Sequence, residues 1–229
     1  VVGPSRALAA VIEVTSAMYE PGVVERHSGH ERSWFAVGAP DPRGSKNIPV
    51  AAALLELAGV VERVDDINSP KWMKLILNAA ELVPSAILDL SIVETTKFKD
   101  MKAVMLAAGD EAVEAAKLLD YKIRPIFGMT GLDAASPETF VKTILDELAA
   151  NYILPHSKST VLQDWMKGRH SEVNELNGLV VKALEAHCQK APTNQAVVEF
   201  ALAIERGEKT RGIHNYGPLL ERIAELKSS

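Results

Sequence analysis

The pattern of apolar and polar positions changes near residue 67. Before that point, residues 8–37 hold short apolar runs rich in β-branched side chains, separated by Pro–Gly and Ser–Gly breaks. Such runs are typical of short strands joined by turns, and we expect a small antiparallel meander. A loop at 41–47, an apolar helix near 49–59 and a strand around 60–64 should follow. After residue 67 the sequence predicts almost only helices.

The second part of the chain opens with a strong helix signal. Ser69 and Pro70 place a hydroxyl cap before a proline at the first helical position, and Ser136–Pro137 repeats this pattern. The stretch 155–170 reads as a main loop, and residues 212–218 should close the packed part. We expect helices at 70–88, 98–119, 137–151, 173–190 and 193–207.

Two stripes of side chains run along the predicted helix at 70–88. The polar stripe holds Lys71, Lys74, Asn78, Glu81 and Ser85 at steps of three and four residues. A solvated surface is the usual explanation of such a stripe, and a functional role competes with it. The other stripe is apolar at helical spacing and should face the core: Trp72, Leu75, Ile76, Ala79, Val83, Ala86 and Ile87.

The predicted helix at 173–190 has an apolar face of its own. Gly178 costs helix stability relative to alanine and therefore predicts a close helix contact. Cys188 is interpreted as a small buried apolar residue. The side chains at core-facing spacing are Val173, Leu176, Val180, Ala183 and His187.

Composition narrows the class of protein. A chain of 229 residues with 47% hydrophobic residues can bury a full core, in one large domain or two small ones. The net charge of −5 is spread along the chain, which does not predict nucleic-acid binding. A single cysteine excludes an internal disulfide framework and is compatible with the cytoplasm, and no apolar run is long enough for a membrane span. The first residue is not methionine, so we expect part of a longer protein.

The polar residues with the clearest chemistry are Lys74, Asn78 and Glu172. A lysine ammonium is a suitable proton donor to a carbonyl oxygen that becomes an alkoxide. An asparagine one helical turn away can donate to the same oxygen. Glu172 could pair with the lysine or accept from a product hydroxyl. A glutamate directly after Ser171 could equally complement the dipole of the following helix.

The other polar clusters do not predict chemistry. The H-x-x-H-E cluster at 27–31 lies in a predicted hairpin loop without a second ligand group nearby, which favours a solvated turn over a metal site. His170 is interpreted as a loop or helix-start residue. No histidine–aspartate pattern accompanies Ser159 or Thr160, so neither is a convincing nucleophile.

Three sequence blocks resemble one known family. KWMKLILNAAELVPSAI at 71–87, STVLQDWMKGRHSEVNELNGLVV at 159–181 and APTNQ at 191–195 are similar, in order and separation, to the helical substrate domain of the ketopantoate reductase (2-dehydropantoate 2-reductase) family. The resemblance implies a mainly α fold. Residues 67–229 would form a substrate and dimerisation domain like the C-terminal domain of 6-phosphogluconate dehydrogenase. Residues 1–66 would be a small β-rich remnant of a Rossmann-type dinucleotide-binding domain.

The resemblance also implies an activity and a set of site residues. The family reduces a 2-oxo acid to a 2-hydroxy acid with NADPH, in pantothenate biosynthesis, and a cytoplasmic homodimer is expected. Lys74 would be the proton donor and Asn78 would bind the substrate. Thr160 stands where the family has a substrate-binding serine, and Glu172 would lie at the substrate and nicotinamide-ribose end of the cleft. Further matches are interpreted as structural: Asp164, Asn177, Gly178, Pro192 and Asn194.

The chain departs from the family pattern in three places. Leu82 replaces a second substrate asparagine, and Ile92 occupies another polar substrate position. Both changes favour a more apolar 2-oxo acid than ketopantoate. None of the 14 glycines forms the G-x-G-x-x-G fingerprint of dinucleotide binding, so we expect this chain to be inactive by itself. The alternative is a non-catalytic helical module for oligomerisation or for binding a small acid.

Overall fold

The computed structural model describes residues 3–130, 135–151 and 156–229. The chain forms two compact units. The sequence predicted a boundary between two functional domains at residues 66 and 67, and this boundary stays a prediction. The units comprise residues 1–74 with 123–136, and residues 75–122 with 137–229.

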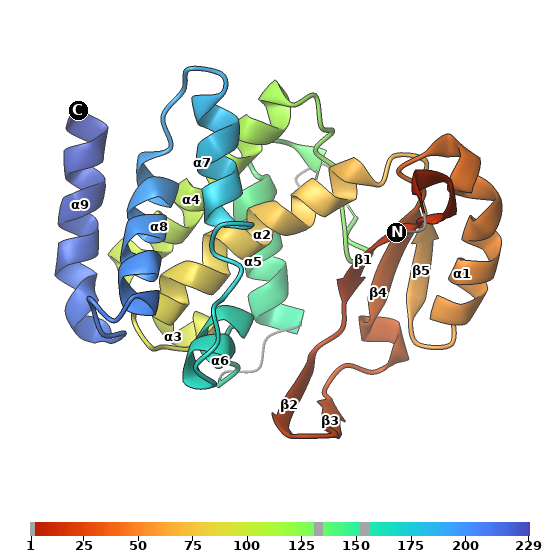
Figure 1. Cartoon of the computed structure of the whole chain (residues 1–229), viewed down its shortest axis with the longest axis horizontal. Helices are drawn as coiled ribbons and strands as arrows, with labels where there is room; N and C mark the ends of the chain where they lie inside the picture. The colour runs from red at the N-terminus through yellow and green to blue at the C-terminus, as the bar shows by residue number, and fades with distance from the viewer. Residues whose placement is uncertain (1–2, 131–134, 152–155) are drawn as a thin grey trace. The chain divides into compact units, whose positions relative to one another are not determined.

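The first unit is built on a three-stranded sheet with the strand order β1-β4-β5 (Figure 1). Strand β1 is antiparallel to β4, and β4 is parallel to β5. Strands β2 and β3 form a separate antiparallel hairpin. The strands are β1 (Ala9–Glu13), β2 (Ser16–Glu20), β3 (Val23–Arg26), β4 (Trp34–Gly38) and β5 (Val60–Arg63).

The predicted meander is therefore wrong in its pairing. Within residues 8–37, only β2 and β3 pair as neighbours in the sequence, whereas β1 pairs with β4, which follows the hairpin. All five residues of β4, WFAVG, are buried. A strand in which polar and apolar residues do not alternate must be buried on both faces. The central position of β4, between β1 and β5, also gives it a hydrogen-bonded partner on each edge. The predicted strand around 60–64 is confirmed as β5.

Helix α1 (Ile48–Leu55) connects β4 to β5 and gives the crossover that two parallel strands require. It confirms the helix predicted near 49–59, although it ends four residues earlier. Gly59 opens β5 against the backbone of Ser33, where a Cβ would lie 2.4 Å from the Ser33 carbonyl oxygen. This unit also contains the short 3-10 helices η1 (Pro4–Arg6), η2 (His30–Arg32) and η3 (Pro42–Asn47).

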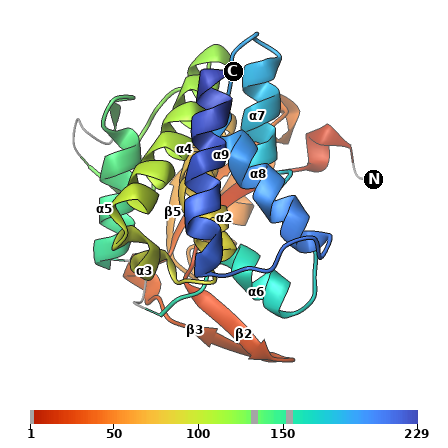
Figure 2. The same ribbon diagram turned by 90° about the vertical axis from the view of Figure 1, so that its left-hand side faces the viewer.

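The second unit is helical, and the main core cluster of its described residues draws on five helices (Figures 1 and 2). Helix α8 packs against α4, α7 and α9, and α4 also packs against α3 and α5. The core includes Val83, Met101, Leu162, Phe200 and Leu219. The helices are α2 (Asn68–Ile87), α3 (Ile92–Thr96), α4 (Lys99–Leu118), α5 (Phe140–Asn151), α6 (Thr160–Met166), α7 (Asn177–Glu185), α8 (Pro192–Glu205) and α9 (Tyr216–Ser228), with η5 (Ile213–Asn215) before the last.

Most predicted helices are confirmed, and two further helices lie in stretches predicted as loops or ends. The helices predicted at 98–119 and 193–207 are α4 and α8, and that at 137–151 is α5 with a later start. Helix α6 lies within 155–170. Helix α9 begins within 212–218 and buries Leu219 and Ile223, so the packed part continues beyond residue 218. No helix in the described ranges is both long and apolar enough to cross a bilayer.

The helix predicted at 173–190 is shorter at both ends. It begins at Asn177 because Leu176 has a non-helical backbone, with φ −100° and ψ −100°. It ends before Cys188, whose φ of 56° lies in the left-handed region that terminates helices. Cys188 and His187 are exposed, so their predicted burial is wrong. The other core-facing positions in this segment are buried as predicted.

Helix α2 also begins differently from the prediction. The Asp66 carboxylate accepts hydrogen bonds from the backbone N–H groups of Asn68 (3.0 Å) and Ser69 (3.3 Å), and from the Ser69 hydroxyl. Ser69 thus lies inside the first turn and is fully buried, and Asp66 satisfies the free N–H groups in its place.

The polar stripe of α2 is mostly not a solvated surface. Lys71 is exposed, Lys74 and Asn78 are half-buried, and Glu81 and Ser85 are buried. The Ser85 hydroxyl donates to the carbonyl of Glu81 at 2.7 Å. A solvated surface, the usual explanation of such a polar stripe, therefore does not apply to most of α2, because these polar side chains are wholly or partly buried.

Candidate functional site

Lys74 and Asn78 lie one turn apart on α2, as predicted from their spacing. Lys74 belongs to the first unit and Asn78 to the second. Both side chains are half-buried, so each retains access to solvent.

The Lys74 ammonium is held between a carboxylate and an aromatic ring. It donates to the carboxylate of Glu13 at the end of β1, and the two side chains are 23% and 13% exposed. It also lies 5.0 Å from the centroid of the Phe127 ring, within the range of a cation–π interaction. Phe127 in turn packs edge-on against Trp34, with 5.5 Å between the ring centroids.

Two of these neighbours could not be found from the sequence. Glu13 lies 61 residues from Lys74 in an ordinary strand, and no motif joins them. The backbone of Phe127 has a φ of 61°, which is unusual for a bulky residue and recurs at functional sites.

Thr160 is the exposed first residue of α6. The preceding Ser159 caps this helix by accepting from the N–H of Leu162 at 3.2 Å. The same hydroxyl donates to the carbonyl of Leu82 on α2 at 2.9 Å. The start of α6 is therefore fastened to α2 one turn beyond Asn78.

Glu172 lies in a turn before α7, with its side chain exposed. Its carbonyl accepts from the N–H groups of Glu175 (3.1 Å) and Leu176 (2.9 Å). Because α7 begins only at Asn177, Glu172 is outside its first turn, and the helix-dipole interpretation of this glutamate is wrong. Asn177 donates to the carbonyl of Ala79, beside Asn78, at 2.9 Å. The structure thus fastens the segments of Thr160 and Glu172 to one stretch of α2.

Asn177 and Asn194 have the structural role predicted for them. Both are fully buried, and the amide of Asn177 donates to the Asn194 oxygen at 2.8 Å. The amide of Asn194 donates to the carbonyl of Ala108 (3.0 Å) and to Glu111 (2.6 Å). Glu111 also accepts from the backbone N–H groups of Thr193 and Asn194, and so caps α8. This network joins α2, α4, α7 and α8.

The R-H-S-E block is anchored by Glu205 at the end of α8. Its carboxylate accepts from the N–H of Ser171 (2.8 Å) and the indole of Trp165 (2.9 Å), and it contacts His170 at 3.2 Å. Burial alone would raise the pKa of Glu205, but these hydrogen bonds outweigh it and lower the pKa below its ordinary value. His170 is a loop residue here, as predicted.

Leu82 and Ile92, the two apolar residues at positions where the family pattern has polar ones, are both packed against other side chains. Leu82 is half-buried and packs against the core of the helical unit. Ile92, the first residue of α3, is 7% exposed and belongs to the same unit's buried residues. Among the residues that the structure describes, no three histidine, cysteine or acidic side chains gather as a metal site would require.

A comparison with protein-family models decides the family. The model described as "Ketopantoate reductase PanE/ApbA C terminal" matches residues 66–205, which is more than half of the chain. The chain belongs to the ketopantoate reductase family. The predicted fold class is confirmed as well, since the structure is mainly helical with a small sheet.

Individual relatives agree with this assignment. A 2-dehydropantoate 2-reductase from Archaeoglobus fulgidus is 28% identical over 172 residues, which are 75% of this chain and 52% of the relative. The solved structure of a PanE/ApbA family ketopantoate reductase from Ralstonia eutropha JMP134 is 27% identical with a TM-score of 0.68, over 87% of this chain and 59% of that one. A D-mandelate dehydrogenase solved with NADH shares the fold, with a TM-score of 0.73 at 16% identity, over 90% and 64% of the two chains. This chain spans about half the length of the curated relative it matches.

Proposed function

We propose that this chain carries the substrate half of an NADPH-dependent 2-oxo acid reductase. Family membership supports the reaction class. The observation that carries the proposal is the arrangement on α2, where Lys74 and Asn78 lie one turn apart. The segments of Thr160 and Glu172 are fastened to the same stretch of this helix, by Ser159 at Leu82 and by Asn177 at Ala79.

Each residue has a chemical role in this proposal. The Lys74 ammonium donates its proton to the carbonyl oxygen as that oxygen becomes an alkoxide. The amide of Asn78 donates a hydrogen bond to the same oxygen and stabilises its developing charge. The Thr160 hydroxyl holds the substrate, and Glu172 accepts from the new hydroxyl at the nicotinamide-ribose end. Glu13 and Phe127 hold the ammonium in position before substrate arrives.

The residues of this chain do not fit the whole cofactor. NADPH would supply the hydride, but no glycine loop of the G-x-G-x-x-G type is present to bind its pyrophosphate. We therefore assign to this chain only substrate contacts and the proton donor. We propose that the 229 residues by themselves do not turn over, and that the working enzyme is a homodimer.

The substrate should be more apolar than ketopantoate. Leu82 and Ile92 replace polar side chains of the family pattern, and both are packed rather than free to donate hydrogen bonds. A site without those donors leaves the hydroxyl of ketopantoate unpaired, which costs affinity. A 2-oxo acid with a branched aliphatic side chain meets these requirements.

Substrate binding can be tested without the cofactor. The 229-residue chain would be titrated with ketopantoate and with 2-oxoisovalerate by calorimetry. Lys74→Ala and Asn78→Ala should each weaken binding by about tenfold, the value of a lost charged or buried hydrogen bond. Lys71→Ala is the matched control, because Lys71 is exposed three residues away on the same helix. Equal affinity of all variants would reject the proposed site.

Turnover requires a nucleotide-binding half. Joined to that half of the Ralstonia relative, the chain should oxidise NADPH with 2-oxo acids, and Lys74→Ala should lower turnover at least about 100-fold. Near-normal turnover of this variant would remove Lys74 from the mechanism. NADPH oxidation by the 229 residues alone would contradict the proposed division of labour. Acid binding without turnover in the joined protein would favour the non-catalytic binding module instead.

A further inference from the structure

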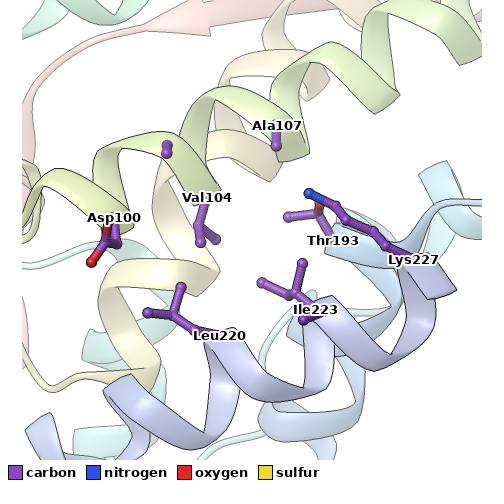
Figure 3. Close-up of a pocket in the computed structure, with 9 residues that line it drawn as sticks. Asp100, Val104, Ala107, Thr193, Leu220, Ile223 and Lys227 are labelled. Carbon is purple, nitrogen blue, oxygen red and sulfur yellow. The ribbon is translucent and has the colours of Figure 1, made fainter.

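A pocket of about 340 Å³ lies between α4, α8 and α9 in the helical unit (Figure 3). Helix α8 packs against both of the other helices. Alanines at positions where α4 and α9 face the pocket leave the space open: Ala103 and Ala107 on α4, and Ala224 on α9. None of the lining residues belongs to α2 or to the segments that carry Thr160 and Glu172.

The walls of the pocket are apolar and follow from helical spacing. On α9 the lining residues Leu220, Ile223, Ala224 and Lys227 recur at steps of three and four, so they share one face. Val104 lines the pocket from α4, and Figure 3 shows its side chain pointing toward those of Leu220 and Ile223. Such a surface matches an aliphatic chain.

The two ends of the pocket carry opposite charges. Figure 3 shows Asp100 at one end and Lys227 reaching over the other, near Ala107. Asp100 is already engaged, because its carboxylate accepts from the Tyr216 hydroxyl at 2.7 Å. Lys227 has no carboxylate partner among the residues that the structure describes. Lys227 is exposed, so the charge at this pocket that remains available to a ligand is positive.

Thr193 supplies a second unsatisfied group. It lines the pocket from the first turn of α8 and is 1% exposed. Within the described chain, its hydroxyl has no hydrogen-bond partner. Its backbone N–H, in contrast, is hydrogen-bonded, because it donates to the carboxylate of Glu111 at 2.8 Å. A buried hydroxyl left unpaired costs about 1–3 kcal/mol, and such groups point to a missing ligand or water.

We propose that this pocket binds an aliphatic carboxylate of medium chain length. The alkyl chain lies on Val104, Leu220 and Ile223. The carboxylate pairs with the Lys227 ammonium and accepts a hydrogen bond from the Thr193 hydroxyl. Asp100 at the opposite end repels the head group and so fixes the direction of binding. This site is separate from the proposed 2-oxo acid site and does not depend on it.

The probes are octanoate, octanol and octylamine, titrated into the 229-residue chain and followed by amide NMR. Octanoate should bind at least about fivefold more tightly than octanol, equivalent to about 1 kcal/mol. Octylamine should bind no better than octanol. Resonances of α4 and α9 should shift, and those of α2 should not.

Three variants locate the site. Lys227→Met should abolish the preference for octanoate and leave octanol binding intact. Ala224→Leu should block both ligands by filling the pocket, and it should fold normally because Ala224 is exposed. Thr193→Val should weaken octanoate more than octanol. Glu221→Gln, on the same helix but outside the pocket, is the control and should change neither affinity.

Several results would overturn the proposal. Octanoate affinity that is indifferent to both Lys227→Met and Ala224→Leu would place the ligand elsewhere. Tighter binding of octylamine would show that Asp100 sets the preference. Self-association that Ala224→Leu abolishes and octanoate leaves unchanged would show that a second copy of the chain covers this face.

Discussion

Replacement of Asn194 by alanine tests the packing of the helical unit. Asn194 is fully buried and makes three side-chain hydrogen bonds to other helices. Its amide donates to the Ala108 carbonyl and to Glu111, and its oxygen accepts from Asn177. Because Asn177 holds the carbonyl of Ala79, this side chain supports the contact of α7 with α2 beside the candidate site.

The expected loss follows from these bonds. A buried neutral hydrogen bond contributes about 1 kcal/mol and a charged one about 2 kcal/mol, so three sum to about 4 kcal/mol. Part of this free energy is retained in the variant, because two hydrogen bonds remain. Glu111 still accepts from the backbone N–H at position 194, and Asn177 still donates to the carbonyl of Ala79. We expect Asn194→Ala to lower the free energy of unfolding by about 3 kcal/mol, a large share of a typical domain's stability.

Urea unfolding followed by far-ultraviolet circular dichroism measures this loss, because the helical unit dominates the signal. The slope of the free energy against urea should stay the same, as the native surface changes little. Gln195→Ala on the next position of α8 is the control and should cost less than about 0.5 kcal/mol. A loss below about 1 kcal/mol for Asn194→Ala would refute the reasoning, because the network would then contribute no more than a surface contact.

Two further predictions concern helix packing and acid stability. Gly109→Ala should destabilise the chain by about 1–2 kcal/mol, because the added Cβ would lie 2.4 Å from a methyl group of buried Val141. Gly217→Ala has open space and should be neutral or slightly stabilising, and Val141→Ala should rescue part of the Gly109→Ala loss in thermal unfolding. Folding lowers the pKa of Glu205, so its contribution is full above its ordinary pKa of 4.5 and is lost as the pH falls through the folded value. The stability difference between the wild type and Glu205→Gln should therefore be constant at neutral pH and shrink below about pH 4.5, and a difference independent of pH would contradict the assignment.

The sequence determined most of the helices and which residue types meet on one helix. Helical spacing predicted α2, α4 and α8 and placed Lys74 and Asn78 one turn apart, because that spacing is fixed by the backbone geometry alone. The motif blocks were sufficient to identify the family. These properties are local, or are carried by short runs of residues.

Strand pairing and burial of the polar stripe needed the tertiary structure. The order β1-β4-β5 depends on which strand is buried on both faces. In the sequence β1 is followed by β2, and yet β1 pairs with β4 in the sheet. Glu81 and Ser85 are spaced like surface residues, yet other parts of the chain cover them. The partners of functional groups are also nonlocal, as Glu13 for Lys74 and Asn177 for Ala79 show.

The α4–α8–α9 pocket shows the same division. The sequence contains its alanines and its lysine, but nothing in their spacing brings α4 to face α9 or places the hydroxyl of Thr193 between them. Local backbone preferences act over a few residues, whereas a cavity depends on how helices far apart in sequence pack. The sequence thus determined most of the helices, the family and the spacing of Lys74 and Asn78, and packing alone decided the partners of Lys74 and where a ligand could enter.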